Sequence, residues 1–134
     1  MDTLTKERRS WNMSRIRGKN TTPERLARSL LHRMGYRFRL HVKALPGTPD
    51  IVLPKHKVVI FVHGCFWHRH KGCKNCSTPS SNRAFWLRKF RGNTRRDASH
   101  QEALRKLGWR SFVLWECEVS DADVLRTRLE RLPL

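Results

Sequence analysis

Imidazole and thiol side chains are concentrated in the segment HGCFWHRHKGC. Its Cys65, His70 and Cys73 are spaced to converge on one loop, and thiolate with imidazole is a ligand set that Zn²⁺ prefers. Cys76 or Cys117 could complete four ligands, and the spacing does not choose between them. Four protein ligands would make the site closed and structural rather than catalytic. The alternative is buried free thiols and solvated histidines, but three cysteines and a histidine rarely fall within twelve residues by chance.

A second group of candidates centres on one acidic residue. Asp50 is the only Asp or Glu between Arg25 and Arg96, a stretch that holds seventeen Lys and Arg. It follows Pro49 at the start of a short apolar segment, and the next apolar segment ends at His63. Neighbouring strand ends would place Asp50 and His63 around a hard cation such as Mg²⁺, which prefers carboxylate, carbonyl and water oxygens. The alternative is an Asp that only makes a hydrogen bond within its own turn.

Four further residues each allow two interpretations. Glu24 lies three residues after Thr21, a capping-box spacing that would satisfy its carboxylate locally. Phe66 and Trp67 could belong to the core, or they could form a wedge or a stacking platform for bases. Trp86 lies in the next expected helix and could join either arrangement.

The charge indicates the kind of partner. The 134 residues include 29 Lys and Arg against 11 Asp and Glu, a formal charge of +18, and nucleic acid is the usual partner of such a chain. No apolar run approaches the roughly 20 residues of a membrane span. The opening MDTLTKERRS lacks the apolar stretch of a secretory signal. We therefore expect one soluble, intracellular domain.

The hydrophobic pattern predicts the element order ααβββααβα, a sheet flanked by helices. A helix starting at the Thr21 cap should end before Gly35, because glycine is favoured just past a helix C-terminus. The other expected helices cover residues 3–17, residues 82–107 with an interruption near Gly92, and a last segment capped at Ser120. The expected strands cover residues 36–42, 50–53, 58–63 and 109–115.

Taken together, these segments resemble the very-short-patch repair endonucleases, bacterial enzymes that nick DNA beside the thymine of a T·G mismatch. The resemblance covers about residues 8–131 and rests on NMSRIRGKNTTPE, LPGTPDIV, VIFVHGCFWHRHKGC, FWLRKF-x-x-N and GWRSFVLWECE. It implies a single α/β domain with a restriction-endonuclease-like mixed β-sheet core, flanking helices and a structural zinc site. Residues 1–20 would form a basic helix that clamps DNA, and residues 21–134 the endonuclease domain.

The resemblance also implies roles at the catalytic centre. Asp50 and the backbone carbonyl of Val62 would bind catalytic Mg²⁺. His68 would activate the attacking water, and His63 would support the scissile phosphate or the water shell of the metal. Glu24 matches a family position near those waters, in addition to its capping role.

Zinc and DNA contacts follow from the same resemblance. The structural zinc would be bound by Cys65, His70, Cys73 and Cys117, with Cys76 as the alternative ligand. The aromatic residues that intercalate into DNA would be Phe66, Trp67 and Trp86. On the N-terminal helix, the wedge residues would be Met13 and Ile16.

The expected function is a Mg²⁺-dependent single-strand nick 5′ to the T of a T·G mismatch, which initiates very-short-patch repair of deaminated 5-methylcytosine. Double-stranded DNA would be the substrate of a monomer in the bacterial cytoplasm, associated with the nucleoid and with other mismatch-repair proteins as further partners. A zinc-stabilised DNA-binding module without catalysis and a basic RNA-binding protein are the alternatives. Neither needs Glu24, Asp50, His63 and His68 together.

Overall fold

A four-stranded mixed sheet forms the centre of the protein, in a computed structural model that describes residues 21–73 and 78–134. The strands are β1 (Arg39–Leu40), β2 (Ile51–Leu53), β3 (Val58–His63) and β4 (Arg110–Trp115), and they lie in this order across the sheet. The first three strands pair antiparallel, and β3 pairs parallel with β4. The expected helix over residues 3–17, with Met13 and Ile16, and the alternative ligand Cys76 lie outside the described residues.

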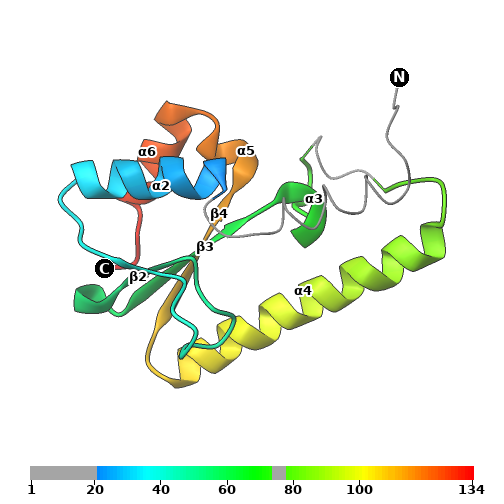
Figure 1. Ribbon diagram of the computed structural model, residues 1–134, viewed down its shortest axis with the longest axis horizontal. Helices are drawn as coiled ribbons and strands as arrows, with labels where there is room; N and C mark the ends of the chain where they lie inside the picture. Colours follow the sequence, from blue (N-terminus) through cyan, green and yellow to red (C-terminus); the bar gives the residue numbers. More distant parts are fainter. Residues whose placement is uncertain (1–20, 74–77) are drawn as a thin grey trace.

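Helices cover both faces of this sheet (Figure 1). On one face lie α2 (Thr22–Arg33), α5 (Glu116–Val119) and α6 (Ala122–Glu130), while the long α4 (Arg83–Lys106) crosses the other. A 3-10 turn, Pro54–His56, joins β2 to β3, and the short α3 (Cys65–His68) follows β3 directly. Within residues 21–73 and 78–134, no helix combines the length and apolar character needed to cross a bilayer.

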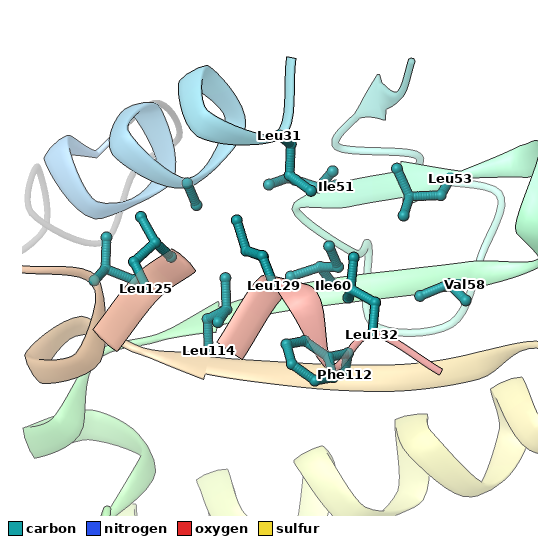
Figure 2. Packing of buried hydrophobic residues seen from close by; sticks show 12 residues of the cluster. Leu31, Ile51, Leu53, Val58, Ile60, Phe112, Leu114, Leu125, Leu129 and Leu132 are labelled. Carbon is teal, nitrogen blue, oxygen red and sulfur yellow. The ribbon is translucent and has the colours of Figure 1, made fainter. Parts of the chain in front are cut away.

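The alternation of β3 explains how the sheet serves two cores. Val58 and Ile60 pack towards α2 and α6, where Leu31 and Leu129 are fully buried (Figure 2). Val59 and Phe61 pack against α4 instead. Because side chains alternate along a strand, His63 at the end of β3 belongs to the α4 side. The strand therefore presents this histidine to the middle of the long helix.

Most helix and strand positions agree with the expectation, including the cap at the start of α2. The Thr21 hydroxyl accepts the backbone N–H of Glu24 at 3.4 Å. Gly35 follows the helix with a φ of +95°, a conformation that glycine adopts without strain. The strand expected over residues 36–42 is reduced to two residues, because Tyr36 and Phe38 pack against the core cluster outside the ladder.

Three local predictions are wrong. The helix over residues 83–106 continues through Gly92, since glycine in a helix costs only about 1 kcal/mol and neighbouring contacts outweigh it. The cap of α6 is Asp121, whose carboxylate accepts two backbone N–H groups, while the Ser120 hydroxyl donates to the Cys117 carbonyl. The loop expected after His63 contains α3, which starts two residues later at Cys65.

Candidate active site

An open cavity of about 580 Å³ lies where the start of α2, the start of β2, the end of β3, α3 and the middle of α4 meet. Most of the residues predicted to do chemistry line it: Glu24, Asp50, Val62, His63, Phe66, Trp67 and His68. Trp86 packs against Phe66 and Trp67 from α4 and is not among the lining residues. The cavity thus brings together side chains from segments far apart in the sequence.

One wall of the cavity is a carboxylate cluster, Glu24, His41 and Asp50. Their donor atoms all lie within 4.8 Å of one another. One Asp50 oxygen accepts the backbone N–H of Val62 at 2.7 Å, and the Glu24 carboxylate accepts from the His41 Nε2 at 2.8 Å. Burial, then the negative charge of Glu24, raises the pKa of Asp50 to about 6, against the opposing Val62 N–H and His41. A cation between the two carboxylates would relieve this cost.

Another wall of the cavity is a histidine cluster, His63, His68 and Asp97. The His68 Nδ1 lies 2.7 Å from an Asp97 oxygen, and the His63 ring stacks on the His68 ring with centroids 3.8 Å apart. Burial, then the neighbouring His68, lowers the pKa of His63 to about 4, so the ring is neutral near pH 7. Burial would raise the pKa of Asp97, but its hydrogen bond to His68 and nearby histidine charges hold it below its usual value.

Two members of these clusters, His41 and Asp97, are absent from the sequence-based prediction. Asp97 carries a signal that could have identified it. It is the first acid after the long basic stretch and lies four residues after Asn93, so both occupy one face of a helix. No comparable signal marks His41, because its position depends on the pairing of β1 with β2.

The Cys/His cluster shares the short helix α3 with the cavity, because Cys65 begins this helix and His68 ends it. Cys65, His70, Cys73 and Cys117 offer donor atoms within 4.8 Å of one another, with the His70 Nδ1 3.4 Å from the Cys117 sulfur and 3.7 Å from the Cys65 sulfur. Tetrahedral zinc holds sulfur and nitrogen ligands about 3.5 Å apart, given bonds of about 2.3 and 2.0 Å. The four residues therefore fit a tetrahedral metal.

The thiols of this cluster must lose their protons to bind a metal. Burial raises the pKa of Cys65 to about 12 and also raises that of Cys117. Both thiols therefore keep their protons at neutral pH unless a cation replaces them. The His70 ring is held in place by stacking on Trp115, with centroids 4.3 Å apart.

The short helix α3 is tied to the surrounding elements at both ends. At its start, the Cys65 N–H donates to a carboxylate oxygen of Glu116 at 3.0 Å. At its other end, the Asn93 side chain donates to the Trp67 carbonyl at 3.0 Å. These bonds link α3 to α5 and α4, so the residues on it have a fixed orientation relative to the cavity.

An aromatic cluster extends from α3 onto α4. The Phe66 ring lies 5.1 Å from Trp67, 5.6 Å from Trp86 and 5.1 Å from Phe90. Phe90 is only 4 % exposed, whereas the neighbouring Phe85 is 51 % exposed. The cluster therefore runs from the interior to the surface beside the cavity.

An α/β domain whose cavity joins two carboxylates to histidines, in a chain of charge +18, has the features of a nuclease that acts on DNA or RNA. Comparison with known proteins narrows this class. Residues 1–75 match the family described as DNA mismatch endonuclease Vsr. The chain belongs to this family of DNA endonucleases, as the resemblance predicted.

Individual relatives cover almost the whole chain. The type II nicking enzyme V.XorIIP of Xanthomonas oryzae pv. oryzae is 51% identical over 131 residues, which is 98% of this chain and 96% of the relative. The type II nicking enzyme V.NmeAIP of Neisseria meningitidis is 44% identical over 98% of this chain and 93% of its own. DNA mismatch endonuclease Vsr of Escherichia coli is 40% identical over 92% of this chain and 79% of its own.

Proposed function

We propose that the protein nicks one strand of duplex DNA 5′ to the T of a T·G mismatch in a Mg²⁺-dependent reaction, and thereby initiates very-short-patch repair of deaminated 5-methylcytosine. The observation that carries this proposal is that a carboxylate cluster and a histidine cluster line one cavity. The relatives V.XorIIP and V.NmeAIP, both described as nicking enzymes, support cleavage of a single strand. DNA is the proposed substrate, and the high positive charge favours contact with its phosphates.

Asp50 and the Val62 carbonyl are the proposed Mg²⁺ ligands, with Glu24 facing the metal-bound waters. The N–H and C=O of one strand residue point to the same side, so a Val62 residue that donates to Asp50 also turns its carbonyl towards it. Two carboxylates and a carbonyl are the oxygen donors that Mg²⁺ prefers. When bound, the cation would neutralise the phosphate and stabilise the leaving oxygen.

His68 is the proposed base. Its Nδ1 is engaged by Asp97, so Nε2 is the nitrogen that accepts a proton as a water oxygen attacks the phosphorus and the phosphodiester P–O bond breaks. Asp97 then stabilises the protonated ring, as a carboxylate does in other histidine-based sites. His63, kept neutral by burial, supports the phosphate or the water shell through a hydrogen bond.

Mismatch selection would come from the aromatic residues. Phe66, Trp67 and Trp86 are the proposed wedge, because a T·G wobble pair unstacks at lower cost than a Watson–Crick pair. Residues 1–20 would clamp the duplex from its other groove, with Met13 and Ile16 as further wedge residues. Discrimination would then precede the chemical step.

The remaining parts of the proposal concern the framework. Zn²⁺ at Cys65, His70, Cys73 and Cys117 would be structural, because four protein ligands leave no open position. Residues 21–134 would form a variant of the restriction-endonuclease-like fold. The enzyme would act as a monomer in the cytoplasm at the nucleoid, with other mismatch-repair proteins as further partners.

A nicking assay tests this function. Two labelled duplexes, identical except for T·G in place of C·G, are incubated with the protein and Mg²⁺ or with EDTA, in several flanking contexts. We expect one nick 5′ to the mismatched T, absent from matched DNA and from the EDTA samples. Tight mismatch binding without cleavage in any context would instead identify a zinc-stabilised binding module. Equal cleavage of matched DNA would contradict mismatch specificity.

A further inference from the structure

His41 lines the cavity and makes two hydrogen bonds there, one through its ring and one through its backbone N–H. The ring is 12 % exposed, and its Nε2 lies 2.8 Å from a carboxylate oxygen of Glu24. A carboxylate only accepts, so this ring nitrogen carries the proton and donates. The backbone N–H of His41 donates to the carbonyl of Asp50 at 3.2 Å. His41 therefore contacts the Glu24 carboxylate through its ring and the main chain of Asp50 through its own main chain.

The backbone of His41 is in an unusual conformation. Its φ is +49°, in the left-handed region that costs a residue with a side chain about 1 kcal/mol or more. Pairing of Leu40 with Ile51 puts His41 directly opposite Asp50, one step beyond the end of the β1–β2 ladder. This turn of the chain directs the histidine ring towards Glu24 instead of continuing the strand. Strained residues of this kind are concentrated at functional sites.

Packing of α2 does not depend on the contact between His41 and Glu24. Ala27 and Leu31 of α2 are fully buried in the main core, and the Thr21 hydroxyl already caps the first turn. Glu24 is itself 6 % exposed, although a flexible acid at a helix start is normally in water. The hydrogen bond thus fixes the direction of the carboxylate rather than the position of the helix.

We propose that His41 is a positioning residue that holds the Glu24 carboxylate towards Asp50, so that the two acids act together on one divalent cation. The inference rests on the proposed function and extends it to a residue outside the metal-ligand set. A partner that orients a ligand in this way commonly contributes 10- to 100-fold to metal affinity, roughly the range expected here. Burial of two like charges side by side makes this orientation costly without a cation.

Binding of Mn²⁺ to the zinc-loaded full chain tests the proposal without DNA or turnover. Free Mn²⁺ is followed by electron paramagnetic resonance in wild-type protein and in His41→Ala, His41→Gln and Asp50→Ala, where the last variant identifies the signal that belongs to this cluster. We expect His41→Ala to weaken binding about tenfold. His41→Gln should recover most of the loss, because its amide can donate to Glu24. His56→Ala, a histidine that packs on Tyr36, is the matched control and should bind as wild type.

A double-mutant cycle separates positioning from general stability. If His41 acts through the Glu24 carboxylate, His41→Ala should have little further effect on Mn²⁺ affinity in a Glu24→Gln background. Wild-type affinity in His41→Ala, or equal losses in both backgrounds, would overturn the inference. Mismatch nicking that still requires Asp50 and Mg²⁺ would in that case leave the proposed function intact. A wild-type chain that nicks but binds no Mn²⁺ through Asp50 would overturn the metal assignment and the role of His41 together.

Discussion

The cavity and the Cys/His cluster both take residues from the four-residue helix α3, but they differ in their donor atoms. The cavity is open, about 580 Å³ in volume, and both of its donor clusters contain a carboxylate. Among the described residues that line it, none is a cysteine. The Cys/His cluster brings four soft donors together with distances already suited to one tetrahedral ion.

This difference separates chemistry from stability within one short stretch of chain. In the proposed mechanism, some donors in the cavity bind a cation while others exchange a proton, which requires access for water and phosphate. A metal bound by the Cys/His cluster would link α3 to α5 through Cys117 and would stabilise the wall that carries His68. We therefore expect changes in the cavity to affect turnover, and changes in the Cys/His cluster to affect folding.

The largest effect on turnover should come from Asp50. Replacing it by Ala or Asn should lower the nicking rate about 10³-fold or more, because a cation contributes several kcal/mol of charge stabilisation. Mismatch binding and Tm should change little, since burial disfavours the ionised form of this acid. Asp50→Asn is the matched variant because its amide oxygen can still accept the Val62 N–H. Rates near wild type in either variant would remove Asp50 from the mechanism.

The next effect tests the Cys/His cluster. Cys65→Ala should lose stoichiometric zinc and about 3–5 kcal/mol of stability, comparable with removal of a native crosslink. Zinc analysis and thermal unfolding measure both quantities, and Cys76→Ser is the control that should keep one zinc per chain. A Cys65→Ala protein with full zinc and unchanged Tm would contradict the structural-site assignment. Loss of zinc in Cys76→Ser would identify that residue as a ligand.

How much the sequence reveals differs between these two regions. The family resemblance predicted the four residues of the Cys/His cluster. The close spacing of three of them already indicated a metal site. Asp97 and His41 were not predicted, since each reaches its partner across the fold, from α4 to α3 and from β1 to α2. Contacts of this kind depend on strand register and helix packing, which a local pattern does not encode.

The helices and strands also differ in how well the sequence predicted them. Strands β3 and β4 were predicted almost residue for residue, because their short length and their β-branched and aromatic residues favour a strand over a helix. Gly92 misled the prediction of α4, since a local helix-breaking tendency of about 1 kcal/mol is smaller than the packing that overrides it. The sheet order and the placement of β1 at its edge had no local signal at all.

A smaller effect should distinguish the aromatic wedge from a mere extension of the core. Trp67→Ala should reduce the preference for T·G over C·G duplexes about 10- to 100-fold, as expected for one lost base-stacking contact of 1–3 kcal/mol. Competition binding measures this ratio. The matched control is Phe90→Leu, which removes a buried ring of the same cluster and should lower stability while leaving the preference unchanged. Reversed outcomes would mean that Trp67 serves the core.

The smallest effect concerns the unfolding free energy of the zinc-loaded protein without Mg²⁺ between pH 4 and 6.5. The pKa of Asp50 is raised to about 6, so this residue favours the folded state at low pH and loses that contribution as the pH rises. The pKa of His63 is lowered to about 4, so its contribution is present above pH 6.5 and is lost as the pH falls. The contributions of Asp50 and His63 to the unfolding free energy therefore change in opposite directions between pH 4 and 6.5.

Replacing one of the two residues should therefore reveal the pH-dependent contribution of the other. In Asp50→Asn, we expect stability to increase with pH by about 1–2 kcal/mol more than in wild type over this window, as measured by urea unfolding in EDTA-free buffer without divalent cations. In His63→Gln, the unfolding free energy should change with pH in the opposite direction, because only the contribution of Asp50 then remains. Groups outside the cavity titrate alike in all three proteins and cancel in the differences. The same dependence of the unfolding free energy on pH in all three proteins would contradict the opposing contributions of Asp50 and His63. It would also mean that burial of the Asp50 carboxylate has no cost that a cation could relieve.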